Sequence, residues 1–320
     1  MSLLLTILLF VLGLILIIKG SDWFVDSTIW IARTLNIPEF IIGATLVSLC
    51  TTLPELLVST GAAVSGDTSM ALGNAIGSVA CNTGLILGTV IVFSTPAMHH
   101  RNAIRLKSTF ISGALAIYLL LAFVFGEFNY VIGIIFLLLS GVFVYYNYYE
   151  ARKYREAQEQ IPDADRSRKT VIRNAVLFVV GLGFTIAGAQ LMIKYGFDIA
   201  KALKVPTIVI GVTMTALGTS LPELVTAITA LRKKSASLSV GNIFGANILN
   251  LTLVLGGTSI IKPIITEGNT LSFHLPIILG ITMIAALGTL IFKKKYPRFL
   301  GVLLLISYFS YIALTAVFIR

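Results

Sequence analysis

The sequence predicts an all-α membrane protein with ten transmembrane helices in two inverted five-helix repeats. Three observations support this prediction: ten long apolar segments, a repeat with a fixed offset of 168 residues, and an odd number of segments in each half. Of the 320 residues, 57% are hydrophobic and 12% are charged, whereas soluble domains carry about 25% charged residues. This composition excludes a soluble enzyme, a nucleic-acid-binding domain and a disordered protein.

Each of the ten segments is long enough for a membrane helix, which needs about 20 mostly apolar residues. The first segment has neither a basic start nor a cleavage site, so we expect a retained helix and not a signal peptide. Gly, Pro, Ser and Thr interrupt the second and third segments of each half. The expected spans are 3–19, 38–65, 69–93, 103–125, 128–148, 173–193, 207–231, 236–260, 273–292 and 299–318.

A polar stretch over 149–172 separates a first five-helix repeat (1–148) from a second (173–320). If the N-terminus is outside, most Lys and Arg residues lie in connections on the same side of the membrane as this polar stretch. The positive-inside rule then places both termini outside and the central loop in the cytoplasm. The connection 194–204, which carries three Lys on the outside, runs against this orientation.

The internal repeat decides the architecture. With an offset of 168 residues, IIGATLVSLCTTLPEL (41–56) aligns with VIGVTMTALGTSLPEL (209–224) without a gap. With the same offset, MALGNAIGSVACNTGLILG (70–88) aligns with LSVGNIFGANILNLTLVLG (238–256). Since each half has five spans, the second half enters the membrane from the opposite side. Inverted repeats with interrupted helices are typical of secondary transporters.

Of the fourteen Asp and Glu residues, only Glu55 and Glu223 lie well inside apolar spans, and they occupy equivalent positions in the two repeats. A carboxylate at bilayer depth costs at least about 2.5 kcal/mol, so it normally faces a cavity, an ion or a partner. No Lys or Arg lies in these spans to pair with either residue. Two hydrogen-bonded, protonated structural glutamates are the alternative interpretation.

Side chains around each glutamate supply further oxygen atoms. Pro54 and Pro222 lack an N–H and crowd the preceding turn, so backbone carbonyls near Thr51 and Thr219 become available as ligands. Oxygen ligands select Ca²⁺, Mg²⁺ or alkali ions over Zn²⁺ or Cu⁺, and two carboxylates balance one divalent or two monovalent cations. The residues that share a helix face with a glutamate are Ser48, Thr51 and Thr52 in the first repeat and Ala216, Thr219 and Ser220 in the second. The next helices align Asn74, Ser78 and Asn82 with Asn242, Ala246 and Asn250.

GATLVSLCTTLPEL with GNAIGSVACN, and GVTMTALGTSLPEL with GNIFGANILN, resemble the two alpha-repeats of the cation/calcium exchanger superfamily. The match is best to the prokaryotic type of its sodium/calcium exchanger branch, and it covers most of the chain. The resemblance implies ten helices in two inverted halves, with the second and third helices of each half forming a central site for four ions.

The resemblance also implies roles for particular residues. Calcium would be bound by Glu55 and Glu223 with the carbonyls of Thr51 and Thr219. Sodium sites would use Thr52, Ser78 and Ser220 and the carbonyls of Ser48 and Ala216. Asn82 and Asn250 would lie at the centre between them.

Two positions depart from the pattern of the superfamily. Ala246 stands where relatives often have Ser, which removes a hydroxyl from one sodium site. Asn250 stands where potassium-dependent relatives have Asp, which argues against potassium dependence.

We therefore expect an electrogenic or near-electrogenic antiporter that is not an enzyme and moves sodium in and calcium out by alternating access. The helices over about 3–33 and 173–203 are expected to slide. We expect no cofactor, no nucleic-acid partner and a monomer in a prokaryotic cell membrane. A proton/calcium antiporter, a gated cation channel and an intramembrane hydrolase are the alternatives.

Overall fold

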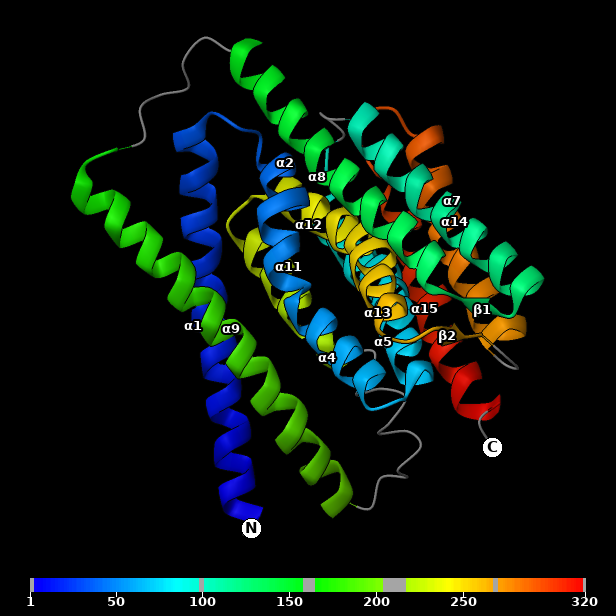
Figure 1. Cartoon of the computed structure of the whole chain (residues 1–320). Helices are drawn as coiled ribbons and strands as arrows, with labels where there is room; N and C mark the ends of the chain where they lie inside the picture. The colour runs from blue at the N-terminus through cyan, green and yellow to red at the C-terminus, as the bar shows by residue number, and fades with distance from the viewer. Residues whose placement is uncertain (1–2, 98–100, 158–164, 204–216, 267–269, 319–320) are drawn as a thin grey trace.

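The computed structural model describes residues 3–97, 101–157, 165–203, 217–266 and 270–318, and helices dominate them (Figure 1). The predicted all-α membrane fold is confirmed. The seventh expected span, 207–231, is described only from residue 217 onward, where α11 (Leu221–Arg232) forms its second half. Within the described residues, nine helices are long and apolar enough to cross a membrane: Leu3–Leu35, Glu39–Val64, Thr68–Ser94, Arg101–Phe125, Tyr130–Tyr154, Arg168–Ala202, Ala236–Ile261, Thr270–Ile291 and Arg298–Thr315.

The first helix of each half is longer than its expected apolar span and agrees closely with the expected sliding helices over 3–33 and 173–203. Helix α1 (Leu3–Leu35) continues well past the expected end at residue 19, and α9 (Arg168–Ala202) extends the expected span 173–193 at both ends. Helix α1 ends only at Asn36, whose φ of 54° is left-handed, and Pro38 then prevents the helix from resuming at once.

This part of α1, beyond the expected apolar span 3–19, contains two acidic residues, Asp22 and Asp26. Lys233, which follows α11, pairs with both of them, at 3.7 Å from Asp22 and 2.8 Å from Asp26. Near this ion pair, the buried Ser21 hydroxyl donates to Thr229 Oγ1 of α11 over 3.0 Å. These contacts hold one part of α1 against α11.

The second and third spans of each half are interrupted helices. The first break falls at Thr52, directly before the turn that contains Pro54, and Ser220 and Pro222 repeat it in the second half. Short π-helical segments widen the third spans at Cys81 and Asn250; such π segments often mark functional sites. The elements of these spans are α2 (Glu39–Ile42), η1 (Gly43–Val47), α3 (Ser48–Thr51), α4 (Leu53–Val64), α5 (Thr68–Ala80), η2 (Cys81–Leu87), α6 (Gly88–Ser94), α12 (Ala236–Leu249), η3 (Asn250–Val254) and α13 (Leu255–Ile261).

The remaining elements enclose this centre. The apolar core is formed largely by the third spans with α7, α8, α14 and α15 around them. A short antiparallel pairing of β1 with β2 matches Glu127 with Ile265 and Phe128 with Ile264. The outer elements are α7 (Arg101–Phe125), β1 (Glu127–Phe128), α8 (Tyr130–Ala157), β2 (Ile264–Ile265), η4 (Thr270–His274), α14 (Leu275–Ile291) and α15 (Arg298–Phe318).

Helices α1 and α9 pack against each other through glycines on one flank of the bundle (Figure 1). A Cβ added at Gly20 would lie 2.7 Å from the carbonyl oxygen of Gly181, and one at Gly188 would lie 2.7 Å from that of Gly13. The offset of 168 residues relates Gly13 to Gly181 and Gly20 to Gly188. The crossing is therefore pseudo-symmetric, with backbone against backbone, as small residues allow in membranes.

We expect Gly181→Ala to destabilise the protein by about 1–3 kcal/mol, the usual cost of overpacking. The added Cβ would lie 2.6 Å from the backbone nitrogen of Phe24. Gly183, on the same helix, has no atom within 4 Å of an added Cβ, so Gly183→Ala is the matched control. Thermal unfolding of the purified variants checks this; equal melting temperatures for the two would contradict it.

Candidate ion-binding site

Ten of the eleven predicted site residues are described and buried, with exposed fractions of at most 6%. Ala216 lies outside the described residues. All ten come from the interrupted second and third spans of the two halves. The buried ten are Ser48, Thr51, Thr52, Glu55, Ser78, Asn82, Thr219, Ser220, Glu223 and Asn250.

The two glutamates lie in the first turns of α4 and α11, each directly after a helix break. Both are fully buried. Among the ion pairs of the described residues, none involves Glu55 or Glu223. An ionised pair at this depth therefore needs a cation from outside the protein, since an uncompensated buried charge is very costly.

Hydrogen bonds tie each broken helix to the third span of the other half. The Thr51 hydroxyl donates to Asn242 Oδ1 over 3.2 Å, and the Thr219 hydroxyl donates to Asn74 Oδ1 over 3.0 Å. The offset of 168 residues relates Thr51 to Thr219 and Asn74 to Asn242, so the two bonds are equivalent under the repeat. The two halves therefore share one hydrogen-bonded centre.

A second pair of bonds repeats within the halves. The Ser59 hydroxyl of α4 donates to the carbonyl of Ala71 over 3.2 Å. In the second half the donor is on the other helix, where Ser239 of α12 donates to the carbonyl of Ala227 over 3.0 Å. Ser59 is equivalent to Ala227 and Ala71 to Ser239, so the same two positions are bonded in each half, but the serine is on the second span in one half and on the third span in the other.

The amide of Asn74 adds bonds that hold the first glutamate in place. Its Nδ2 donates to the backbone carbonyl of Glu55 over 3.2 Å and to Ser59 Oγ over 2.9 Å. At the equivalent position, Asn242 Nδ2 is buried without a partner among the described residues. The first half is therefore the more fully bonded one.

The two carboxylates also differ in their nearest hydroxyl. Ser78 Oγ donates to Glu55 Oε1 over 3.4 Å and lies 3.3 Å from Thr219 Oγ1. Ala246 occupies the equivalent buried position and offers no hydroxyl. Both carboxylate oxygens of Glu223 lack a hydrogen-bond partner among the described residues, whereas Glu55 lacks one for Oε2 only.

Further buried polar atoms of the site have no partner within the described part of the protein. They are both amide atoms of Asn82 and of Asn250 and the hydroxyls of Thr52 and Ser220. A buried polar group without a partner costs about 1–3 kcal/mol, so these atoms are suited to bind ions or water. Within the described residues, no group of three or more His, Cys, Asp and Glu side chains could hold a metal. Hydroxyl, amide and two carboxylate oxygens form a site suited to hard cations.

Some of these contacts were not predicted from the sequence. The alignment places Asn74 and Asn242 in matching Gly-Asn pairs, but it does not show that each accepts a bond from a threonine of the other half. Asn247 Nδ2 donates to Thr83 Oγ1 over 2.8 Å and adds another bond between the halves. Tyr308 of α15 packs against Gly84 of η2, where an added Cβ would lie 2.6 Å from the Tyr308 Cβ, and nothing in the apolar sequence of its span indicates this.

Comparison with known proteins places the chain in a family. A family model described as "Sodium/calcium exchanger protein" matches residues 5–149 and 173–317. The chain is 33% identical to the uncharacterized membrane protein MJ0091 of Methanocaldococcus jannaschii, over 95% of this chain and 96% of that protein. It is 28% identical to the sodium/calcium exchanger MaX1 of Methanosarcina acetivorans, over 95% of this chain and 97% of MaX1.

A solved structure agrees with this match. The sodium-calcium exchanger NCX_Mj, soaked with 10 mM Na⁺ and zero Ca²⁺, superposes with a TM-score of 0.83 at 29% identity, covering 98% of this chain and 99% of that one. The resemblance seen in the sequence motifs is thereby confirmed. The chain is an integral membrane protein that belongs to the sodium/calcium exchanger family.

Proposed function

We propose that the chain is a sodium/calcium antiporter that works by alternating access at the site between its two halves. The observation that carries the proposal is the pair of buried glutamates, one from each repeat, which no basic side chain of the described residues neutralises. One calcium ion or two sodium ions balance their two charges. Because the unoccupied charged site is costly to move across the membrane, movement is favoured only with a cargo bound.

The ligands of each ion follow from the sequence and from the buried oxygens. Calcium is bound by the carboxylates of Glu55 and Glu223 with the carbonyls of Thr51 and Thr219, where the helices are broken. Sodium sites use Thr52, Ser78 and Ser220 and the carbonyls of Ser48 and Ala216. Asn82 and Asn250 lie between the ions. The unpartnered oxygens of Thr52, Ser220 and the two asparagines support this assignment.

The moving part is the pair α1 and α9, which slides along the rest of the bundle. Its glycine crossing packs the two helices on each other as one unit. Helix α1 is also held to α11 by Ser21, Asp22 and Asp26, through contacts with Thr229 and Lys233. These few polar contacts have to break when the pair slides.

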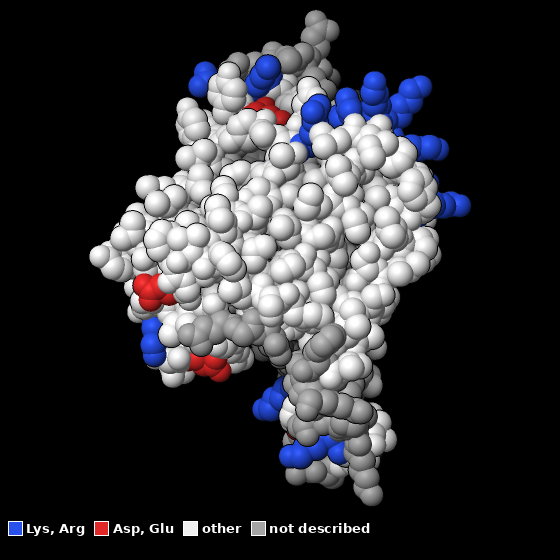
Figure 2. Space-filling model, turned by 90° about the vertical axis from the view of Figure 1, so that its right-hand side faces the viewer, with Lys and Arg blue, Asp and Glu red and all other residues white. Residues whose placement is uncertain are grey.

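The halves are residues 1–148 and 173–320, joined by a cytoplasmic linker at 149–172 into which α8 and α9 extend from its two ends, with both termini outside. The two matched segments of the family model, 5–149 and 173–317, support this division. Figure 1 shows the start of α1 and the end of α15 at the end of the molecule opposite the end of α8 and the start of α9, and Figure 2 shows basic side chains gathered at that opposite end. The positive-inside rule favours this end as the cytoplasmic one.

Calcium uptake into proteoliposomes tests the function directly. We expect uptake to need a sodium gradient of opposite direction and to stop when sodium is equal on both sides. Calcium flux without a countergradient would indicate a channel. Uptake that follows a pH gradient in sodium-free buffer would show that the coupling ion is the proton and not sodium.

We expect Glu55→Gln and Glu223→Gln each to weaken calcium binding at least about a hundredfold, since leaving a buried charge without its partner costs about 3–5 kcal/mol. The change keeps the side-chain size, so the fold is retained. Glu127, exposed in β1, provides the control variant Glu127→Gln. Calcium-for-sodium exchange near the wild-type rate in either site variant would refute the assignment of the two glutamates.

We expect Ala246→Ser to raise the apparent sodium affinity about twofold to tenfold, the range given by one added neutral contact. The new hydroxyl occupies the position that Ser78 holds beside Glu55 in the other half. Calcium affinity is expected to change little. Sodium titrations at fixed calcium and at two pH values measure this, and an unchanged sodium curve together with proton-driven uptake would favour the proton-coupled alternative.

Cysteine labelling tests the orientation. In a background without Cys50 and Cys81, we expect Lys169→Cys, at an exposed position of α9, to react with a membrane-impermeant thiol reagent only from the cytoplasmic side. Ser65→Cys, exposed between α4 and α5, is expected to react only from outside. The reverse pattern would invert the topology.

A further inference from the structure

Two adjoining cavities lie between α7 and α8, away from the ion site. The larger, of about 390 Å³, is lined by side chains that carry polar groups, Asn102, Tyr146, Tyr149, Glu150, Lys153 and Tyr154. The smaller, of about 170 Å³, is apolar, and its lining includes Leu106, Phe110, Leu139, Val142 and Phe143. Tyr146 lines both cavities, so they form one groove with a polar and an apolar end.

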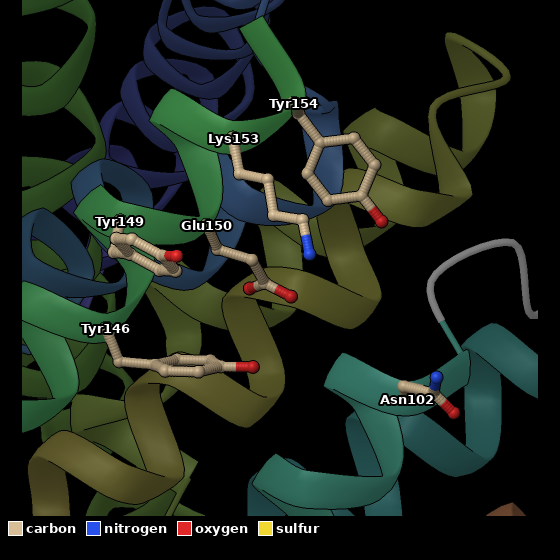
Figure 3. Close-up of a pocket in the computed structure, with 6 residues that line it drawn as sticks. All are labelled: Asn102, Tyr146, Tyr149, Glu150, Lys153 and Tyr154. Carbon is tan, nitrogen blue, oxygen red and sulfur yellow. The ribbon is translucent and has the colours of Figure 1, made fainter. Parts of the chain in front are cut away.

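The groove follows one face of α8, since its lining residues recur three or four positions apart from Leu139 to Lys153. Figure 3 shows Tyr146, Glu150 and Lys153 of α8 reaching into the same space, with Asn102 of α7 opposite. The apolar end is open to the membrane, because Leu106 and Val142 are 50% and 63% exposed.

A buried ion pair separates the two ends. Lys107, only 2% exposed, places its Nζ 3.4 Å from Glu150 Oε2. The ammonium also lies over the rings of Phe40 and Tyr146, at 4.9 and 5.6 Å from their centroids. Lys107 therefore neutralises Glu150, and Lys153 remains as the basic lining residue without an ion pair among the described residues.

The polar end lies at the depth of lipid headgroups. Tyr145, Tyr148 and Tyr149 of α8 are more than half exposed, and tyrosines gather where a membrane meets water. The polar end also lies towards the α8–α9 connection, where basic side chains gather (Figures 1 and 2). A phosphodiester at this depth meets one uncompensated ammonium, a side-chain amide and tyrosine hydroxyls.

We propose that this groove binds one acidic phospholipid from the leaflet on the side of the α8–α9 connection. Its phosphodiester contacts Lys153, its glycerol backbone lies beside Tyr146, and one acyl chain follows the apolar end along Leu139 and Val142. The polar end lies towards the membrane surface and the apolar end towards the bilayer interior, which is how the headgroup and acyl chains of a phospholipid are arranged. This site is separate from the ion site and does not depend on the ions transported.

Native mass spectrometry of the delipidated full-length protein, titrated with phosphatidylglycerol or phosphatidylcholine, tests the proposal. We expect Lys153→Ala to weaken phosphatidylglycerol binding about tenfold, the effect of losing a charge-assisted contact. Val142→Trp is expected to reduce the binding of both lipids by filling the apolar end. Lys169→Ala and Val144→Trp, which change exposed residues outside the groove, are the matched controls and are expected to bind as wild type.

A phosphatidylglycerol with a photoreactive acyl chain provides a second readout that does not depend on variants. We expect cross-links in the segments that contain Phe110 and Leu139. Equal weakening by the control variants would reduce the proposal to nonspecific lipid contact. Binding of soluble glycerol phosphate as tightly as of the whole lipid would show a small-anion site and overturn the role of the apolar end. Cross-links spread over the other helices would overturn it as well.

Discussion

The arrangement of the protein depends on holding two carboxylates, Glu55 and Glu223, at the centre of an apolar bundle. Transfer of an unpaired charge from water into such surroundings is prohibitive, so oxygen-bearing groups have to surround the pair. Breaking the helices before Pro54 and Pro222 frees carbonyls at this depth. The surrounding helices exclude lipid from this irregular backbone, and the bonds from Thr51 to Asn242 and from Thr219 to Asn74 hold the broken ends together.

The two halves are alike in backbone but unequal in chemistry. Each half supplies a proline break, a glutamate and a π-helical segment in its third span. Among the described residues, only those of the first half supply a hydroxyl to their own glutamate, because Ser78 has Ala246 as its counterpart. An inverted repeat provides two similar ends for opening to either side, while unequal side chains allow the ion positions around the two glutamates to differ.

The sequence was sufficient to predict the architecture, and the proposed site residues that the structure describes are all buried, because an ungapped repeat brings equivalent residues to equivalent places. It predicted long first helices over about 3–33 and 173–203, close to α1 and α9, but not that Asp22 and Asp26 of α1 pair with Lys233. It did not predict which threonine pairs with which asparagine, because each bond joins the two halves and its partners are 145 or 191 residues apart in the sequence. The sequence also did not predict the groove beside Lys107, because it depends on how α7 and α8 pack against each other.

The length of α1 also relates the protein to the thickness of its membrane. Thirty-three helical residues span about 50 Å at 1.5 Å per residue, against a hydrocarbon layer of about 30 Å. Helices α1 and α9 must therefore incline or extend beyond the bilayer, and Figure 1 shows them crossing at a marked angle to each other. Since their glycine contacts tie the two together, a thicker bilayer would favour a more upright pair. Lipid chain length is thus a physical variable that acts on the position of the helices independently of any ion gradient.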